Sequence, residues 1–264
     1  LNKMQADAYT LEKASHLKLI CVTATGTNNL DKNYLAQRNI EWRNVAGYST
    51  ECVTQHTFAM LFYLLEKLAY YDNYVKSEAY VNNTTFTHFS NVFHELYGMT
   101  WGIIGLGAIG RRVAQIAAAF GCHVIYFSTS GKNDNPDYSR VSFDDLLSRS
   151  DIVSVHAPLT EKTEGLMNRS AFQKMKKSAV FLNLGRGPIV VEQDLADALL
   201  AEELAAAGLD VLSAEPMHPD NPLKSIKDSG RLLITPHIAW AGVETRRRLM
   251  ETVCQQIQTF FKIC

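Results

Sequence analysis

The segment Gly105-Leu106-Gly107-Ala108-Ile109-Gly110 is the feature that most constrains the fold of this chain. It follows the apolar run 101–104 and precedes a helical pattern at 111–120, so strand, glycine turn and helix succeed one another. In that context the three glycines permit a tight turn, close approach of backbone to a pyrophosphate, and close packing of helix on strand. The N–H groups at the helix start would face the phosphates. The sequence therefore predicts a dinucleotide-binding βαβ unit.

The end of the next strand lacks the acidic residue that usually completes such a site. An Asp or Glu about 20 residues further on normally binds the adenosine ribose. Here the apolar run 123–127 ends in Ser128-Thr129-Ser130-Gly131-Lys132. Without a carboxylate a 2′-phosphate is not repelled, and these hydroxyls and the lysine can bind it. Backbone and hydroxyl contacts can equally hold NAD, so the residues leave NAD and NADP both open.

Short apolar runs alternate with helical patterns, which indicates βαβ units and one parallel sheet. Strands are predicted at 17–22, 101–104, 123–127, 151–156, 180–184, 206–211 and 232–235. Helices are predicted near 111–120, 144–149, 170–177 and 193–204, with a long amphipathic helix over 53–71. Residues 80–98 are aperiodic and predict a surface connection. Right-handed crossovers place most helices on the two faces of the sheet.

Composition excludes several classes of partner. With 264 residues the chain can bury a large core, and its net charge of −1 gives no footprint for nucleic acid or anionic membrane. No apolar run reaches the roughly 18–20 residues of a membrane span. The five cysteines show no CxxC pairing, which argues against a disulfide framework and a zinc site. We therefore expect no metal and a place in the reducing cytoplasm.

Polar residues stand where three of the predicted strands end, and ligands bind beyond the carboxyl ends of such strands. Arg186 lies between two glycines, Asp210 and Glu215 lie at and just past the end of the next strand, and His237 ends the last one. Taken singly, each also fits an ordinary loop residue or a packed histidine. Taken together with a nucleotide site, they make one constellation for reducing a 2-oxo acid by hydride transfer.

Each member of this constellation has a chemical role. The planar fork of Arg186 would bind the substrate carboxylate and polarise its carbonyl. His237, protonated, would deliver a proton to the carbonyl oxygen, and Glu215 would favour that protonated form. His156 follows a strand and could line the cofactor site. The remaining histidines, including His56 in the long helix, show no metal-ligand spacing.

At these residues the chain resembles the D-isomer-specific 2-hydroxyacid dehydrogenases. The matching blocks are 24–31, 105–110, 151–158, 183–187, 208–216 and 235–240, in family order. The resemblance implies Arg186, Glu215 and His237 as the catalytic trio. It implies substrate contacts from Thr25 and Gly26 as well as Arg186 and His237. It implies a cofactor site formed by Gly105, Gly107, Ala108, Ile109, Gly110, Ser128, Thr129, Ala157, Pro158, Thr163, Leu184, Gly185 and Asp210, with Asp210 near the nicotinamide carboxamide.

The resemblance also implies the architecture. A Rossmann-type doubly wound parallel sheet would occupy residues 52–240. A smaller, discontinuous, flavodoxin-like α/β substrate domain would be formed by 1–51 and 241–264. Family members begin with a further strand–helix unit, and the chain is expected to lack roughly its first 40–50 residues. The apolar stripe of 53–71 predicts packing in the core or in a homodimer formed through the nucleotide domain.

Among subfamilies the blocks look most like glycerate dehydrogenase, also called hydroxypyruvate reductase. The expected reaction converts hydroxypyruvate or glyoxylate to D-glycerate or glycolate. Other D-2-hydroxyacid dehydrogenases, D-lactate-like or acting on bulkier 2-oxo acids, stay open, as does a nucleotide-sensing scaffold that resembles a transcriptional corepressor. Glu215 argues against formate dehydrogenase, which lacks the glutamate beside the histidine.

Overall fold

The computed structural model describes residues 1–262, which form two compact units. Unit 1 comprises Leu1–Cys52 and the chain from Trp240 onward, and unit 2 comprises Val53–Ala239. The boundary between them falls inside helix α2 (Thr50–Leu65). The end of the predicted range 241–264, with Cys264, lies outside the described residues. Each unit is described by itself below.

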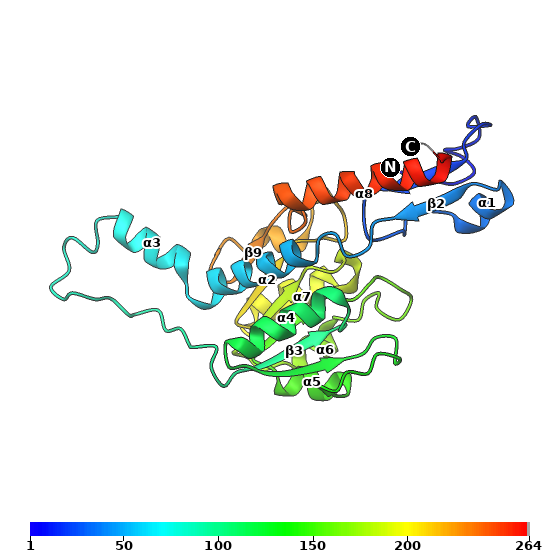
Figure 1. Ribbon diagram of the computed structural model, residues 1–264. Coiled ribbons are helices and arrows are strands. Elements are labelled where there is room, and N and C mark those ends of the chain that lie inside the picture. Colours follow the sequence, from blue (N-terminus) through cyan, green and yellow to red (C-terminus); the bar gives the residue numbers. More distant parts are fainter. Residues whose placement is uncertain (263–264) are drawn as a thin grey trace. The chain divides into compact units, whose positions relative to one another are not determined.

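Unit 2 is built on a seven-stranded parallel sheet with the order β5-β4-β3-β6-β7-β8-β9 (Figure 1). The strands are β3 (Thr100–Ile104), β4 (His123–Phe127), β5 (Ser139–Arg140), β6 (Ile152–Val155), β7 (Val180–Asn183), β8 (Ala206–Leu209) and β9 (Leu232–Ile234). The order reverses at β3, since β4 and β5 lie on one side and β6 to β9 on the other. Ligands bind at the carboxyl ends of strands beside such a reversal.

Helices cover both faces of this sheet. They are α4 (Ala108–Ala119), α5 (Phe143–Arg149), α6 (Arg169–Lys174) and α7 (Glu192–Leu200), with two 3₁₀ turns, η1 (Gly187–Ile189) and η2 (Pro222–Ser225). One core joins α5, α6 and α7 to the sheet, and the other joins α2 and α4 to its opposite face. Strands β6, β7 and β8 are buried throughout, as a parallel sheet covered on both sides requires. The predicted Rossmann-type α/β class is confirmed.

The long helix predicted over 53–71 is wrong, because the chain forms two helices there. Helix α2 ends at Leu65, and α3 (Leu68–Lys76) begins after Lys67, whose φ of 55° lies in the left-handed region. A helix cannot continue through that conformation. The buried stripe of α2 ends at Leu64, and α3 buries none of its residues. Leu68, an apolar residue within the predicted range 53–71, is exposed.

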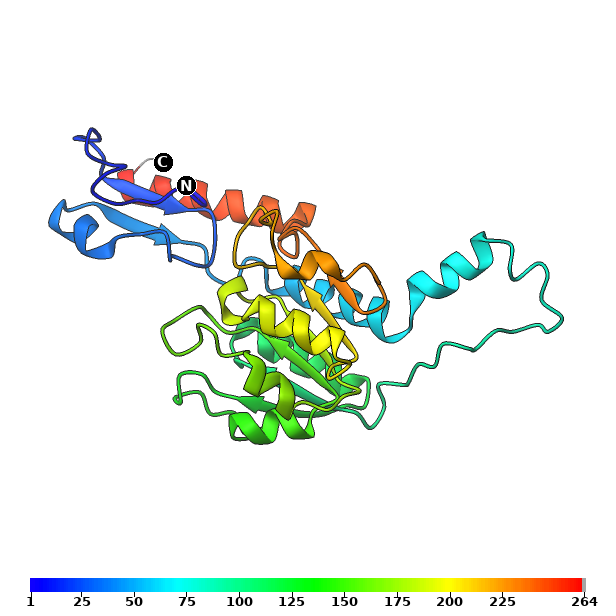
Figure 2. The ribbon, with the colours of Figure 1, turned by 180° about the vertical axis from the view of Figure 1, so that it is seen from behind.

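After α3 the chain continues without helix or strand until β3, which confirms the surface connection predicted for 80–98. Figures 1 and 2 show α3 and this segment extending away from the sheet of unit 2. We call residues 68–97 the arm. The arm returns to the core of unit 2 at the buried Leu96, and next to it Gly98 N–H donates to the Gly121 carbonyl at 3.0 Å.

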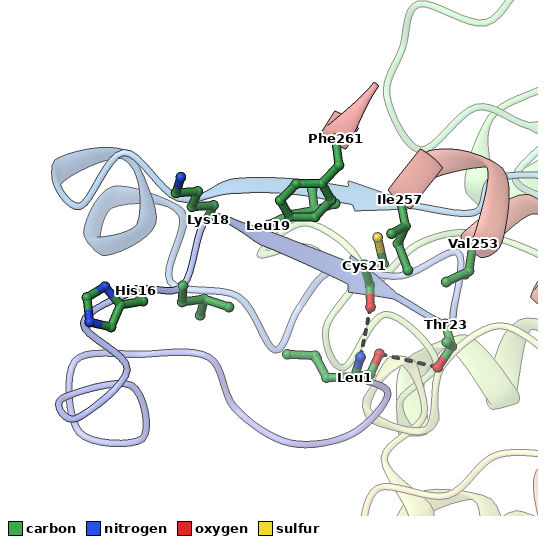
Figure 3. A pocket seen from close by; sticks show the side chains of 10 residues that line it. Leu1, His16, Lys18, Leu19, Cys21, Thr23, Val253, Ile257 and Phe261 are labelled. Carbon is green, nitrogen blue, oxygen red and sulfur yellow. Dashed lines mark hydrogen bonds between the residues drawn. The ribbon is translucent and has the colours of Figure 1, made fainter. Parts of the chain in front are cut away.

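Unit 1 contains a two-stranded parallel sheet of β1 (Leu19–Val22) and β2 (Glu41–Asn44), with α1 (Lys32–Gln37) between them in the chain. Helix α8 (Val243–Phe261) packs on it, and Leu249 and Val253 join Val45 and Tyr48 in a small core. A cavity of about 570 Å³ lies between β1, α8 and the N-terminal segment. Figure 3 shows the side chains that line it. None of the predicted site residues lines this cavity.

The sequence patterns located every strand of unit 2 except β5, but not every element of the chain. Most predicted strands are one or two residues longer than the observed ones, and the helix predicted over 193–204 ends at Leu200. Helix α1 and strands β2 and β5 were not predicted. Strand β5 has two residues, both exposed, and β2 has none that is fully buried, so neither carries an apolar pattern.

Candidate active site

The glycine turn lies at the carboxyl end of β3, beside the reversal of strand order. Gly105 has a φ of +93°, and a Cβ there would stand 2.9 Å from the Ala157 backbone. A Cβ on Gly110 would stand 2.3 Å from the Gly105 carbonyl oxygen. Around Gly107 that space is open, and Gly107 caps α4 without any side-chain hydrogen bond. The first turn of α4 contains no acid, so its N–H groups fit the pyrophosphate of a dinucleotide.

The loop after β4 is tied back to this turn. Ser128 is buried, and its hydroxyl accepts a hydrogen bond from Asn133 N–H at 3.2 Å. The Asn133 amide donates to the Leu106 carbonyl at 2.5 Å. Gly131, at the tip of the loop, has a φ of +71°, and a Cβ there would lie 3.9 Å from Nη2 of Arg140. The loop therefore lies beside an arginine that the sequence analysis did not consider.

The residues that follow β6 pack against the glycine turn. Ala157 is buried under Gly105. Thr163, also buried, donates its hydroxyl hydrogen to the Pro158 carbonyl at 2.7 Å and thus shapes the loop 157–163. His156 Nε2 lies 3.1 Å from the Ser154 hydroxyl, and its Nδ1 is buried without a hydrogen-bond partner. Burial lowers the pKa of His156 to about 3, so its ring is neutral near pH 7.

At the end of β7 an asparagine shapes the turn that presents Arg186. Asn183 Oδ1 accepts from Gly185 N–H, and its amide donates to the Arg186 carbonyl, both at 3.0 Å. Leu184, inside the turn, is buried. A Cβ on Gly187 would lie 1.9 Å from the Leu212 carbonyl carbon. Only glycine fits there, so the Arg186 loop lies directly against the chain that follows β8.

Asp210, after β8, organises the turn that carries His237. Its Oδ1 accepts from the Thr235 hydroxyl at 2.6 Å and from Ile238 N–H at 2.9 Å. Its Oδ2 accepts from Ala239 N–H at 2.9 Å. His237 has a φ of 54°, a strained value for a residue other than glycine, and its N–H donates to the Asp210 carbonyl at 2.8 Å. The buried carboxylate therefore holds the histidine turn in shape.

Glu215 and His237 form a direct pair. His237 Nδ1 lies 2.7 Å from Glu215 Oε2, and about a quarter of each side chain is exposed. Glu215 Oε1 accepts from Leu212 N–H at 3.2 Å. Arg186, Glu215 and His237 follow β7, β8 and β9, which are neighbours in the sheet. The structure thus gathers at one sheet edge the residues that the sequence predicted as a trio.

His56 of α2 also reaches this edge, a contact that the sequence analysis missed. Its Nε2 lies 3.0 Å from the Thr235 hydroxyl oxygen. Because Thr235 gives its only hydroxyl hydrogen to Asp210, His56 Nε2 must donate to Thr235. No sequence signal connects a histidine of an amphipathic helix with a strand end about 180 residues later.

Thr25 and Gly26 lie in unit 1, in the loop after β1. Thr25 donates its hydroxyl hydrogen to the Val45 carbonyl at 3.2 Å, and Asn44 donates its amide to the Thr25 carbonyl at 2.6 Å.

In the part of the chain that the structure describes, no group of His, Cys, Asp or Glu is arranged to hold a metal ion. Among the same residues, no helix is long and apolar enough to cross a membrane.

Comparison with known proteins gives a consistent result. Residues 58–239 match the family described as D-isomer specific 2-hydroxyacid dehydrogenase, NAD binding domain. The chain is 37% identical to a hydroxypyruvate reductase of Blautia hydrogenotrophica, over 99% of this chain and 81% of that protein. It is 33% identical to a glycerate dehydrogenase of Methylorubrum extorquens, over 98% of this chain and 81% of the relative.

A solved structure shares the fold. The D-lactate dehydrogenase of Aquifex aeolicus, complexed with NAD and lactic acid, superposes with a TM-score of 0.88 at 29% identity. The superposition covers 98% of this chain and 80% of that one.

Proposed function

Because the chain belongs to the D-isomer-specific 2-hydroxyacid dehydrogenases, we propose that its substrate is hydroxypyruvate or glyoxylate, which it reduces to D-glycerate or glycolate. The observation that carries the proposal is the Glu215–His237 pair, 2.7 Å apart, at the strand edge that also presents Arg186. A carboxylate-bound imidazole at the same end of the sheet as an arginine suits a small acid with a carbonyl next to its carboxylate.

In the proposed reaction each residue performs one task. The Arg186 fork binds the substrate carboxylate and polarises the carbonyl oxygen. With Nδ1 bonded to Glu215, His237 uses Nε2 to give a proton to that oxygen, which completes the alcohol. A bound dihydronicotinamide supplies the hydride that the carbonyl carbon receives. Glu215 compensates the charge of His237 before the proton leaves. The substrate contacts of Thr25 and Gly26 in unit 1 stay a prediction.

We propose the following cofactor contacts. Gly105, Gly107 and the first residues of α4 bind the pyrophosphate, and Asp210 lies near the nicotinamide carboxamide. NADPH is accepted as well as NADH, because Ser128 stands where a ribose-binding acid would repel the 2′-phosphate. Two positive charges lie near this loop. One is on the exposed Lys132, and the other is on Arg140, whose side chain lies beside Gly131 at the loop tip. Two cations and several hydroxyls are the groups that bind a phosphate monoester.

The proposal is tested by measuring oxidation of NADH and of NADPH with hydroxypyruvate, glyoxylate, pyruvate and a bulkier 2-oxo acid. We expect the highest kcat/KM with hydroxypyruvate or glyoxylate, and a loss of about 10²–10⁴-fold in a His237→Ala variant. Undiminished turnover in that variant would remove the histidine from the mechanism. If NADPH binds far more weakly than NADH, the cofactor part of the proposal is wrong.

We further propose that the protein is a homodimer that works in the cytoplasm. The arm supports the dimer, because α3 buries nothing and a helix so short gains little stability by itself. Its exposed apolar residues are Leu68, Tyr70, Val75, Tyr80, Val81, Phe86, Phe89, Val92, Phe93 and Tyr97. A second copy offers the same surface, so the two arms can bury these apolar residues against each other about a twofold axis. The described cysteines are free thiols, which fits a reducing compartment.

A further inference from the structure

We propose that Glu192 is a positioning residue for the reaction, because its carboxylate fixes the loop that holds Glu215 against His237. The inference rests on the proposed function of that pair. Glu192 is the first residue of α7 and lies outside the predicted trio. Nothing in its sequence surroundings distinguishes it from any other acid at a helix start.

The Glu192 carboxylate binds both ends of one loop, residues 213–221. Its Oε1 accepts from Ser213 N–H at 2.7 Å. Its Oε2 accepts from the Ser213 hydroxyl and from the Asn221 amide, each at 2.7 Å. Hydrogen bonds to an ionised acceptor are stronger than those between neutral groups. Two oxygens therefore hold three donors that lie at opposite ends of the segment.

Between these two ends Met217 packs against the core of unit 2, and Asn221 N–H donates to the His218 carbonyl at 3.1 Å. Residues 213–216 are exposed, and they include Glu215 itself. At the far end Asn221 is buried and accepts from Leu223 N–H at 3.0 Å, so the Asn221 anchor is continuous with η2. In the exposed stretch before Met217, the position of Glu215 thus depends on the Ser213 anchor and on the hydrogen bond from Leu212 N–H.

The Glu192 end of the contact is rigid. Val191 N–H donates to the Met167 carbonyl at 2.9 Å, and Met167 N–H donates to the Ile189 carbonyl at 2.9 Å. Met167 and Ile189 are fully buried. The N-terminus of α7 also favours a negative charge at Glu192. Because the segment before α7 carries Arg186, Glu192 connects the arginine loop to the Glu215 loop.

The test compares Glu192→Ala and Glu192→Gln with Asp194→Asn. Asp194 lies in the same first turn of α7, but its carboxylate accepts from Arg169 N–H at 2.8 Å instead of from the loop. The side chain introduced by Glu192→Gln keeps an acceptor for Ser213 but turns a donor toward the Asn221 amide, so an intermediate effect is expected. We expect kcat/KM for hydroxypyruvate to fall about 10–100-fold in Glu192→Ala, as when other outer partners of a site are removed.

Two further readouts separate positioning from folding. In Glu192→Ala we expect kcat to fall while KM for hydroxypyruvate changes little, because the Arg186 loop that binds the substrate carboxylate is kept. The downfield proton signal of the His237 Nδ1–H, followed by NMR in histidine-labelled protein, should disappear in Glu192→Ala and persist in Asp194→Asn. The NMR signal needs no turnover, so it tests the positioning even if the substrate is wrong.

Persistence of that NMR signal in Glu192→Ala, or an unchanged kcat in that variant, would overturn the proposal. The proposed function itself fails on different grounds. It fails if the parent protein turns over none of the four 2-oxo acids or if His237→Ala is fully active.

Discussion

At the scale of single residues, the site depends on one strained backbone angle. His237 adopts a φ of 54°, and a non-glycine residue in this region costs about 1–3 kcal/mol. The hydrogen bonds from Ile238 and Ala239 to the Asp210 carboxylate offset that cost. Hydrogen bonds to charged groups contribute about 1.5–3 kcal/mol each. Asp210 thus holds the histidine turn in addition to the cofactor contact proposed for it.

Asp210→Asn should therefore reduce catalysis, because an amide has one acceptor oxygen for three donors. We expect kcat, measured well below the melting temperature, to fall at least about 10-fold, as when other outer partners of a site are removed. The matched control is Asp151→Asn, since Asp151 also accepts a backbone N–H, that of Thr100 at 2.9 Å, but before β6 rather than after a strand. Both variants should lower Tm. Equal kcat in the two variants would contradict a role of Asp210 in shaping the turn.

Arg186, Glu215 and His237 could be selected from the sequence, because each is a polar residue just after an apolar run. The strands then carry them to one edge. The interactions of Asp210, His56 and Glu192 could not be predicted from the sequence. They depend on the return path of loops, and neither spacing nor periodicity encodes that path.

At the scale of elements, Gly107 and Gly110 of the glycine turn have different structural roles. A Cβ on Gly110 would collide with the Gly105 carbonyl oxygen at 2.3 Å, whereas a Cβ on Gly107 would meet nothing within 4 Å. Gly110 is needed for packing α4 on β3. Gly107, at a φ of −78°, is under no conformational strain and leaves room for a ligand.

Alanine substitutions should separate the packing role of Gly110 from the ligand-binding role of Gly107. Gly110→Ala should lower stability by about 1–3 kcal/mol through overpacking, measured by denaturant unfolding. Gly107→Ala should fold normally but bind NADH and NADPH more weakly in a fluorescence titration, because its methyl group fills the open space. The interpretation is wrong if Gly107→Ala binds both nucleotides like the parent protein.

Elements with a buried pattern were predicted well, and elements without one were not. Strand β4 was predicted residue for residue, since its apolar run is bounded by polar residues. The break between α2 and α3 was missed, because Lys67 is a common helix residue and its left-handed φ is not visible in the pattern. Strands β2 and β5 are too exposed to show one.

At the scale of the whole molecule, the arm is the feature that a single copy leaves unsatisfied. Phe86 and Phe89 are 91% and 76% exposed, and most of the other aromatic side chains in the arm are exposed as well. Monomeric proteins seldom expose large contiguous apolar patches. This is why we propose a homodimer formed through the nucleotide-binding unit.

Replacing Phe86 and Phe89 by aspartate should produce a monomer in analytical ultracentrifugation, because two charges cannot be buried in an apolar contact. The control is Leu200→Asp, at the end of α7, where a side chain that is 60% exposed lies outside the arm. That variant should remain dimeric. A dimer that survives the double substitution would place the contact elsewhere.

Unit 1 joins residues from two distant parts of the chain, and this affects the order in which the parts of the protein can fold. Leu249 and Val253 of α8 complete the core begun by Val45 and Tyr48. The whole of unit 2 is synthesised between these two contributions. During translation, Val45 and Tyr48 must therefore wait, with that core unfinished, until α8 has left the ribosome. The nucleotide-binding unit has by then left the exit tunnel and can fold first, since domains generally fold as units during synthesis.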